Sequence, residues 1–170
     1  MAAPATVSIR EATSADLEAI NGIYNHAVRT STATWDEVEW SIEKRVTWFE
    51  AHRSGTPVLV AECDGECAGF ACVSRMSEKS GWRFTSEDTI YLDERFRGRG
   101  IGRVLLRALL ARAKEDGLRA IVASISSDNA VSLALHRSLG FEVVGELTNA
   151  GFKFGAWQST TYLLCDLQRD

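Results

Sequence analysis

The sequence has 170 residues and a mass of 18.7 kDa; 45% of the residues are hydrophobic, 25% are charged, and the net charge is −4 at pH 7. These values are typical of a soluble globular chain that can bury one full core, and they predict a single domain over residues 1–170. The acidic balance argues against general binding to nucleic acid or to a membrane surface, since both favour a basic face.

The N-terminus and the cysteines indicate the compartment. The first residues, MAAPATVSIR, lack the charged start and long apolar run of a secretory signal, and no stretch is apolar enough to span a bilayer. The four cysteines, at positions 63, 67, 72 and 165, form no CxxC pair, and the three histidines are scattered, so no metal site is expected. Free thiols suit a reducing compartment, and we expect a cytoplasmic protein.

In the first half of the chain, apolar periodicity predicts a strand, two helices and a hairpin. The turn of the hairpin is Asp64-Gly65. A polar loop follows at residues 74–83, and we expect it to form a wall of a substrate site. The predicted elements are a strand at 7–10, helices at 17–28 and 38–53, and strands at 57–62 and 67–73.

The second half is predicted to alternate strands and helices. A strand at 89–92 leads through a glycine-rich loop into a long helix that ends at Gly117. The later elements are a strand at 120–125 that is expected to be buried on both faces, a helix from the cap at 126–129 to 139, a strand at 141–147, a glycine-rich connection at 149–155 and a strand at 160–167. This order describes a mixed α/β domain whose central sheet takes helices on both faces.

The glycine-rich loop, RGRGIG at residues 97–102, has the features of an anion site. Its glycines leave several backbone N–H groups free beside the positive end of a helix dipole, and five arginines lie nearby, at 95, 97, 99, 103 and 107. The dinucleotide fingerprint GxGxxG fails, because its third glycine would fall on Leu105 or Arg103. The nucleotide P-loop fails too, since Arg103-Val104 replaces Lys-Ser/Thr. A turn whose glycines only supply positive φ is the structural alternative.

The pattern Arg97-x-x-Gly100-x-Gly102 between a strand and a helix resembles the pyrophosphate-binding signature of the GNAT superfamily of acetyl-CoA-dependent N-acetyltransferases. The order of the elements also resembles the GNAT fold over nearly the whole chain. This resemblance implies that acetyl-CoA is the cosubstrate.

Further segments resemble one subfamily, the phosphinothricin and methionine sulfone/sulfoximine N-acetyltransferases. They are TATWDE at 32–37, Arg83-x-Thr85-x-Glu87, DNAxSxxLH at 128–136 and GFKFGxW at 151–157. The chain departs from this pattern beside Glu87, where relatives usually carry a valine and a histidine and this sequence has Ser86 and Asp88. We expect the extra carboxylate to alter the pKa of Glu87 or the choice of substrate.

The resemblance also implies roles for individual residues. Glu87 would be the base that takes the ammonium proton, and His136 would protonate the leaving thiolate. Trp35, Arg83 and Thr85 would bind the substrate, with Arg83 pairing with a carboxylate or phosphinate. The structural alternatives are an exposed acid, a packed histidine and a solvated arginine. The residues implied to bind acetyl-CoA are Ile90, Tyr91, Leu92, Arg97, Gly98, Arg99, Gly100, Ile101, Gly102, Arg103, Asn129 and Ser132.

We therefore expect an N-acetyltransferase that transfers acetyl from acetyl-CoA to the α-amino group of a small amino acid or analogue, directly in a ternary complex. The resemblance implies methionine sulfone, methionine sulfoximine or phosphinothricin as the substrate, and a homodimer. Two alternatives stay open. The same fold could act on a protein N-terminus or a polyamine, or the chain could be a CoA-binding module without turnover.

Overall fold

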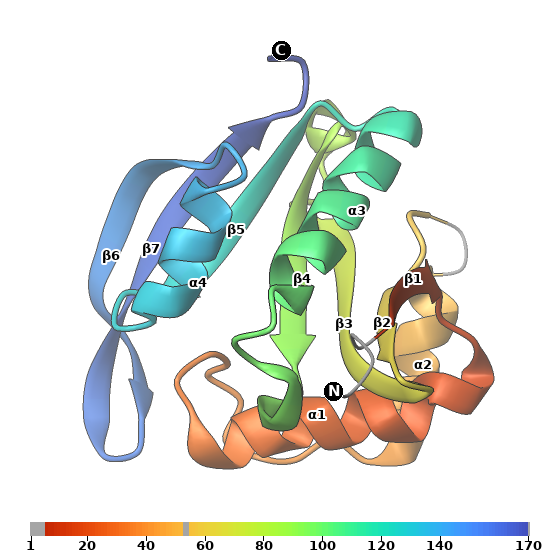
Figure 1. Cartoon of the computed structure of the whole chain (residues 1–170). Coiled ribbons are helices and arrows are strands. Elements are labelled where there is room, and N and C mark those ends of the chain that lie inside the picture. Colours follow the sequence, from red (N-terminus) through yellow and green to blue (C-terminus); the bar gives the residue numbers. More distant parts are fainter. Residues whose placement is uncertain (1–5, 53–54, 170) are drawn as a thin grey trace.

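The structure is a computed structural model that describes residues 6–52 and 55–169. It consists of a mixed seven-stranded sheet with helices on both faces (Figure 1). The strand order is β1-β2-β3-β4-β5-β7-β6. The strands are β1 Val7–Glu11, β2 Leu59–Cys63, β3 Glu66–Arg75, β4 Thr85–Leu92, β5 Ala120–Ser126, β6 Glu142–Lys153 and β7 Ala156–Asp166. The helices are α1 Leu17–Thr30, α2 Ile42–His52, α3 Ile101–Glu115 and α4 Ala130–Arg137, with short 3₁₀ turns at Ser14–Asp16, Ser80–Trp82 and Glu94–Phe96.

Two hydrophobic clusters hold the helices on the sheet. On one face, Leu105, Leu106 and Leu109 of α3 recur at helical spacing, are fully buried, and pack in the cluster that includes β2, β3 and β5 residues. On the other face, Ile20 of α1 is buried in a cluster with Phe70 of β3. Each such side chain contributes about 1.5–3 kcal/mol of burial free energy, so both faces of the central strands are fixed.

The sheet opens between its two parallel strands. β4 pairs with β5 only from Thr85 to Glu87, which lie opposite Ala120 to Val122. Beyond that point β4 runs on to Leu92 and β5 to Ser126, and the two strands diverge (Figure 1). The opening therefore exposes two strand edges in the middle of the sheet, and it sets the position of the site described below.

The order of the elements is the predicted one, but in three regions the boundaries were wrong by four residues or more; in the last of these regions, β7 begins at Ala156 instead of residue 160. The central strand begins at Thr85, four residues before the predicted start. The second helix begins at Ile42 instead of residue 38, because the side chains of Asn21 and Asn25 donate to the Trp40 carbonyl, and Asn25 also accepts from the Trp40 N–H. These bonds hold the backbone at residue 40 in a loop. The last predicted residue of this helix, position 53, lies outside the described residues.

The third wrong boundary concerns residues 149–155, which form the end of β6 and a tight turn instead of a connection. Gly151 pairs with Gln158, and Phe152 pairs with Trp157. A register shift between Leu147 and Gly151 takes up the extra residues, and the turn has positive φ at Phe154 and Gly155. The glycines that suggested a loop therefore mark an irregularity within a strand and the tip of a hairpin.

Candidate active site

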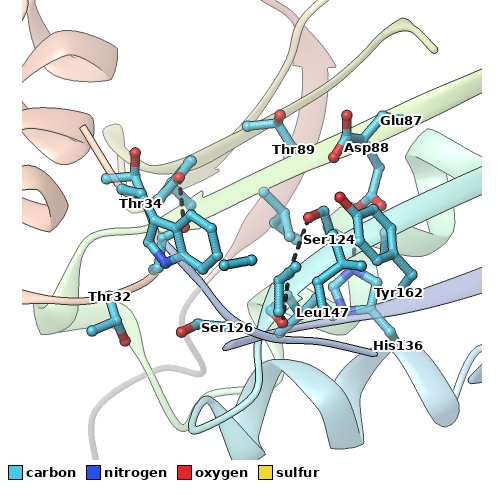
Figure 2. A pocket seen from close by; sticks show the side chains of 18 residues that line it. Thr32, Thr34, Glu87, Asp88, Thr89, Ser124, Ser126, His136, Leu147 and Tyr162 are labelled. Carbon is cyan, nitrogen blue, oxygen red and sulfur yellow. Dashed lines mark hydrogen bonds and ion pairs between the residues drawn. The ribbon is translucent and has the colours of Figure 1, made fainter. Parts of the chain in front are cut away.

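A hollow of about 490 Å³ lies where β4 and β5 diverge (Figure 2). Loop residues 32–35 form one wall, and β4, β5, α4 and the β6–β7 hairpin form the others. Ser124 is exposed and lines the hollow, so the prediction that β5 is buried on both faces was wrong there. The lining residues are Thr32, Ala33, Thr34, Trp35, Glu87, Asp88, Thr89, Ile90, Tyr91, Ala123, Ser124, Ile125, Ser126, His136, Leu147, Ala150, Thr160 and Tyr162; none of these is a lysine or an arginine.

Glu87 stands at the point of divergence. It is the last residue of β4 that pairs with β5, and its side chain is half-buried in the wall of the hollow. Burial, and then the negative charge of Asp88, raise the pKa of its carboxyl group above the ordinary value. A carboxylate with a raised pKa binds a proton more strongly, which suits a general base.

Asp88 and His136 form a buried pair in the same wall. Asp88 Oδ2 lies 3.0 Å from His136 Nε2, and the side chains are each only 2% exposed. His136 Nδ1 lies 2.8 Å from the Ser132 carbonyl oxygen. Burial opposes the charge on the imidazole, but the hydrogen bond and charge of Asp88, with the Ser132 carbonyl, outweigh it and raise the pKa of His136.

The sequence indicated that Asp88 could act on Glu87, but it did not show that Asp88 pairs with His136.

Residues of β6 and β4 hold the loop at residues 32–35 that forms one wall of the hollow. Lys153 of β6 is buried, and its Nζ donates to the carbonyl oxygens of Ser31 and Thr34 at 2.8 and 2.6 Å. A Cβ atom at Gly151 would lie 2.3 Å from the Trp35 ring, so only glycine allows this approach. The Tyr91 hydroxyl donates to the Ala33 carbonyl at 3.0 Å. Sequence reasoning quoted the motif around Lys153 but missed this function.

Of the predicted substrate residues, the structure brings only Trp35 and Glu87 to the hollow. Arg83 is exposed, donates to the Ser80 carbonyl at 3.1 Å, and lies over the Phe84 ring with its guanidinium carbon 4.4 Å from the centroid. It lines a different hollow, together with His52 and Asp116. Thr85 and residues 74–83 do not line the candidate site either.

The glycine-rich loop lies at the N-terminus of α3. Gly98 and Gly100 have φ of 74° and 77°, and in the described part of the chain the N–H groups of residues 98–102 find no backbone acceptor. A Cβ atom at Gly102 would lie 3.1 Å from Leu92 Cδ1, so glycine lets α3 approach β4 closely. Arg97, Arg99 and Arg103 are exposed around these N–H groups. The donors and the positive charge fit a pyrophosphate.

The remaining predicted cofactor residues lie along β4 and at the start of α4. Ile90 and Tyr91 line the hollow, whereas Ile101 is buried and offers a ligand only its N–H group. Asn129 caps α4, since its Oδ1 accepts from the Ser132 N–H at 3.1 Å. Among residues 6–52 and 55–169, no hydrogen bond is assigned to the side-chain N–H₂ group of Asn129.

The described residues were also compared with the requirements of a metal site and of a membrane-spanning helix. Within the described ranges, no three histidine, cysteine, aspartate or glutamate side chains are grouped so that they could hold a metal ion. In the same ranges, no helix has the length and apolarity needed to cross a membrane.

Comparison with known proteins places this geometry in a family. Residues 20–141 match the model of the acetyltransferase (GNAT) family. The chain is 43% identical to the L-methionine sulfoximine/L-methionine sulfone acetyltransferase of Pseudomonas paraeruginosa over 164 residues, which cover 95% of each chain.

Two solved structures are similar in fold and sequence. The phosphinothricin acetyltransferase of Sinorhizobium meliloti, solved with acetyl-CoA, has a TM-score of 0.92 and 36% identity, covering 95% of this chain and 88% of that one. The ribosomal-protein-alanine N-acetyltransferase of Brucella melitensis has a TM-score of 0.91 and 42% identity, covering 94% and 99%. The predicted fold and the resemblance to the sulfoximine and phosphinothricin enzymes are thereby confirmed, and the chain belongs to the GNAT family of N-acetyltransferases.

Proposed function

We propose that the protein transfers the acetyl group of acetyl-CoA directly, within a ternary complex, to the α-amino group of a small amino acid of the methionine sulfone or sulfoximine type. The position of Glu87 carries this proposal. This half-buried carboxylate stands where β4 and β5 diverge, and the opposite end of β4 leads to the glycine-rich loop. A base and a phosphate-binding loop therefore lie at the two ends of one exposed strand edge.

Acetyl-CoA fits the residues at this edge and supplies the acetyl thioester when it is bound. The N–H groups of residues 98–102, with Arg97, Arg99 and Arg103, would hold its pyrophosphate. The β4 backbone from Ile90 to Leu92 would pair with its amide-containing arm as one strand pairs with another, assisted by Asn129 and Ser132. Glu87 takes the proton of the substrate ammonium, and an unpaired β4 N–H group stabilises the oxyanion. The thiolate proton donor assigned to His136 stays a prediction from the resemblance.

The chemistry of the hollow supports a substrate with a neutral polar side chain. Its walls carry the hydroxyls of Ser124 and Tyr162, which can donate to a sulfone or sulfoximine oxygen, whereas the hydroxyls of Thr32 and Thr34 already donate to Asp128 and Tyr24. The carboxylates of Glu87 and Asp88 favour the ammonium end of the substrate, whereas the anionic phosphinate of phosphinothricin would be repelled. Because Arg83 lies outside the hollow, the proposal does not rely on it as a clamp.

The same acidic wall favours a second candidate, a polyamine. The experiment is release of free thiol from acetyl-CoA with methionine sulfone, methionine sulfoximine, phosphinothricin, plain amino acids, spermidine and a short peptide. Turnover mainly on the sulfone and sulfoximine supports the proposal. Turnover mainly on spermidine or the peptide would contradict the proposed substrate but support the transfer of acetyl to an amine. Absence of turnover on every amine, with acetyl-CoA bound, would contradict the proposed function.

Replacing Gly100 by valine is expected to raise the KM for acetyl-CoA by about tenfold. Gly100 has φ of 77°, a conformation that costs a side-chain-bearing residue about 1–2 kcal/mol, so the loop would relax and its N–H groups would turn away from the pyrophosphate. Steady-state kinetics at saturating amine measure this. Gly117→Val is the matched control, since Gly117 has φ of 84° at the other end of α3. An equal rise in KM in the control would contradict a binding role for the loop.

We also propose that the protein is a homodimer, as the subfamily resemblance implies, and the exposed side chains of β6 and β7 suggest these strands as the interface. Large apolar side chains on these two strands are exposed: Val143, Val144, Leu147, Phe152 and Trp157. Light scattering after gel filtration is expected to give twice the chain mass, and Trp157→Ser is expected to shift the protein toward the monomer. A monomeric wild-type protein at micromolar concentration would rule this interface out.

A further inference from the structure

The buried pair of Asp88 and His136 lies next to the proposed base. Asp88 follows Glu87 on β4, so the two side chains leave opposite faces of the strand, yet both line the hollow (Figure 2). Asp88 Oδ2 bonds His136, while Asp88 Oδ1 is buried and has no hydrogen-bond partner among the described residues. Within the described residues, His136 is therefore the side chain bonded to the Asp88 carboxylate.

The hydrogen bonds around His136 indicate its charge state. Nδ1 faces the Ser132 carbonyl oxygen at 2.8 Å, and Nε2 faces Asp88 Oδ2 at 3.0 Å. An imidazole that carries a proton on both ring nitrogens donates to both of these oxygens, and the Ser132 hydroxyl lies 3.4 Å from Nδ1 as well. The raised pKa of His136 favours this charged form. In this form the positive charge of the imidazole offsets part of the negative charge of Asp88.

The charge of Asp88 also acts on two buried thiols. Cys72 of β3 and Cys165 of β7 are buried; burial first, and the charge of Asp88 in addition, raise the pKa of both thiols, that of Cys72 to about 12. Tyr162 of β7 lines the same hollow, whereas His52 at the end of α2 lines a different one and has its Nε2 at 3.3 Å from Ser74 Oγ. Among the described residues, the electrostatic influence on Glu87 besides burial is that of Asp88.

We propose that Asp88 and His136 are a positioning pair that sets how strongly Glu87 holds a proton. Asp88 adds negative charge beside Glu87 and so favours its protonated form, whereas His136 offsets part of that charge. The base would thus be adjusted by the next carboxylate on β4 and by the histidine that pairs with it. This inference rests on the proposed function only in calling Glu87 the base.

The two members of the pair have opposite expected effects. Asp88→Asn removes the negative charge beside Glu87, so the pKa of Glu87 should fall. His136→Gln removes the charge that offsets Asp88 and keeps a donor to Asp88, so the pKa of Glu87 should rise. A base is active when deprotonated. The rise of kcat/KM with pH should therefore move to lower pH in Asp88→Asn and to higher pH in His136→Gln.

The test has a readout that does not depend on turnover. The carboxyl carbon of Glu87 is titrated by NMR in protein labelled with [¹³C]glutamate, with Glu87→Gln to assign the signal and Asp116→Asn as the control. Asp116 pairs with Arg112 on the exposed surface beyond α3, so no change is expected there. The NMR spectrum also reports whether each variant is folded. If His136→Gln does not fold, the direction seen in Asp88→Asn decides.

Movement of the Glu87 titration in opposite directions supports the inference. No movement, or movement in one direction for both variants, would overturn it and leave the pair as a structural link between α4 and β4. The proposed function fails separately, by absence of thiol release with every amine, so the two failures are distinguishable.

Discussion

Replacing Glu87 by glutamine is expected to lower kcat by about 10²–10⁴-fold, the usual contribution of a general base. Glutamine keeps the size and hydrogen-bonding shape of the side chain but cannot accept the ammonium proton. Because Glu87 lies at the opposite end of β4 from the glycine-rich loop, the KM for acetyl-CoA should change little. The measurement is thiol release under saturating acetyl-CoA, followed across pH.

Two features of this experiment separate catalysis from stability. Glu115→Gln, at the exposed last position of α3, is the matched control and should retain full activity. The raised pKa of Glu87 predicts that wild-type kcat/KM rises with pH through that pKa, since activity requires the deprotonated base. Loss of this rise in Glu87→Gln would identify Glu87 as the titrating group. A variant with more than a tenth of wild-type kcat would contradict the role of base.

Replacing Lys153 by methionine is expected to lower the free energy of unfolding by about 1–3 kcal/mol, because two partly buried carbonyl oxygens, of Ser31 and Thr34, lose their donor. Methionine retains the length of the side chain. The loop at residues 32–35 would also lose its attachment to β6, and we expect kcat/KM for the amine to fall by about tenfold or more. Urea denaturation and steady-state kinetics measure the two effects.

Lys114→Met is the matched control, since Lys114 lies exposed in the last turn of α3 and should tolerate the same change. A drop in stability without any loss in kcat/KM would mean that Lys153 supports the fold but not the substrate wall. Equal stability of the two variants would contradict the reading of Lys153 as a buried clamp.

The features that sequence analysis located correctly are local in the chain. The strand, loop and helix around Gly98, Gly100 and Gly102 are contiguous, and the positive φ values and the close approach of α3 to β4 follow from the glycines themselves. The order of all helices and strands was also correct, because each element carries its own apolar periodicity. The role of Glu87 as the base is a prediction from the resemblance, because no spacing in the sequence could give it.

The features that sequence analysis missed depend on contacts between distant residues. Asp88 and His136 are 48 positions apart, and Lys153 is more than a hundred positions from the carbonyls that it binds. No local pattern in the stretch Gly151-Phe152-Lys153 shows that the lysine will be buried. The position of Arg83 is a related case: its motif suggested a substrate contact, but the short 3₁₀ turn at Ser80–Trp82 holds its guanidinium near the Ser80 carbonyl.

The short pairing between β4 and β5 has a mechanical consequence. Three residue pairs form the seam between a half-sheet of β1 to β4 and a half-sheet of β5, β7 and β6. A ligand whose amides pair with the free strand edges would add hydrogen bonds between the two half-sheets. Occupancy by the cosubstrate would then stiffen the whole sheet, and the resistance of the protein to unfolding would follow the concentration of the molecule that it consumes.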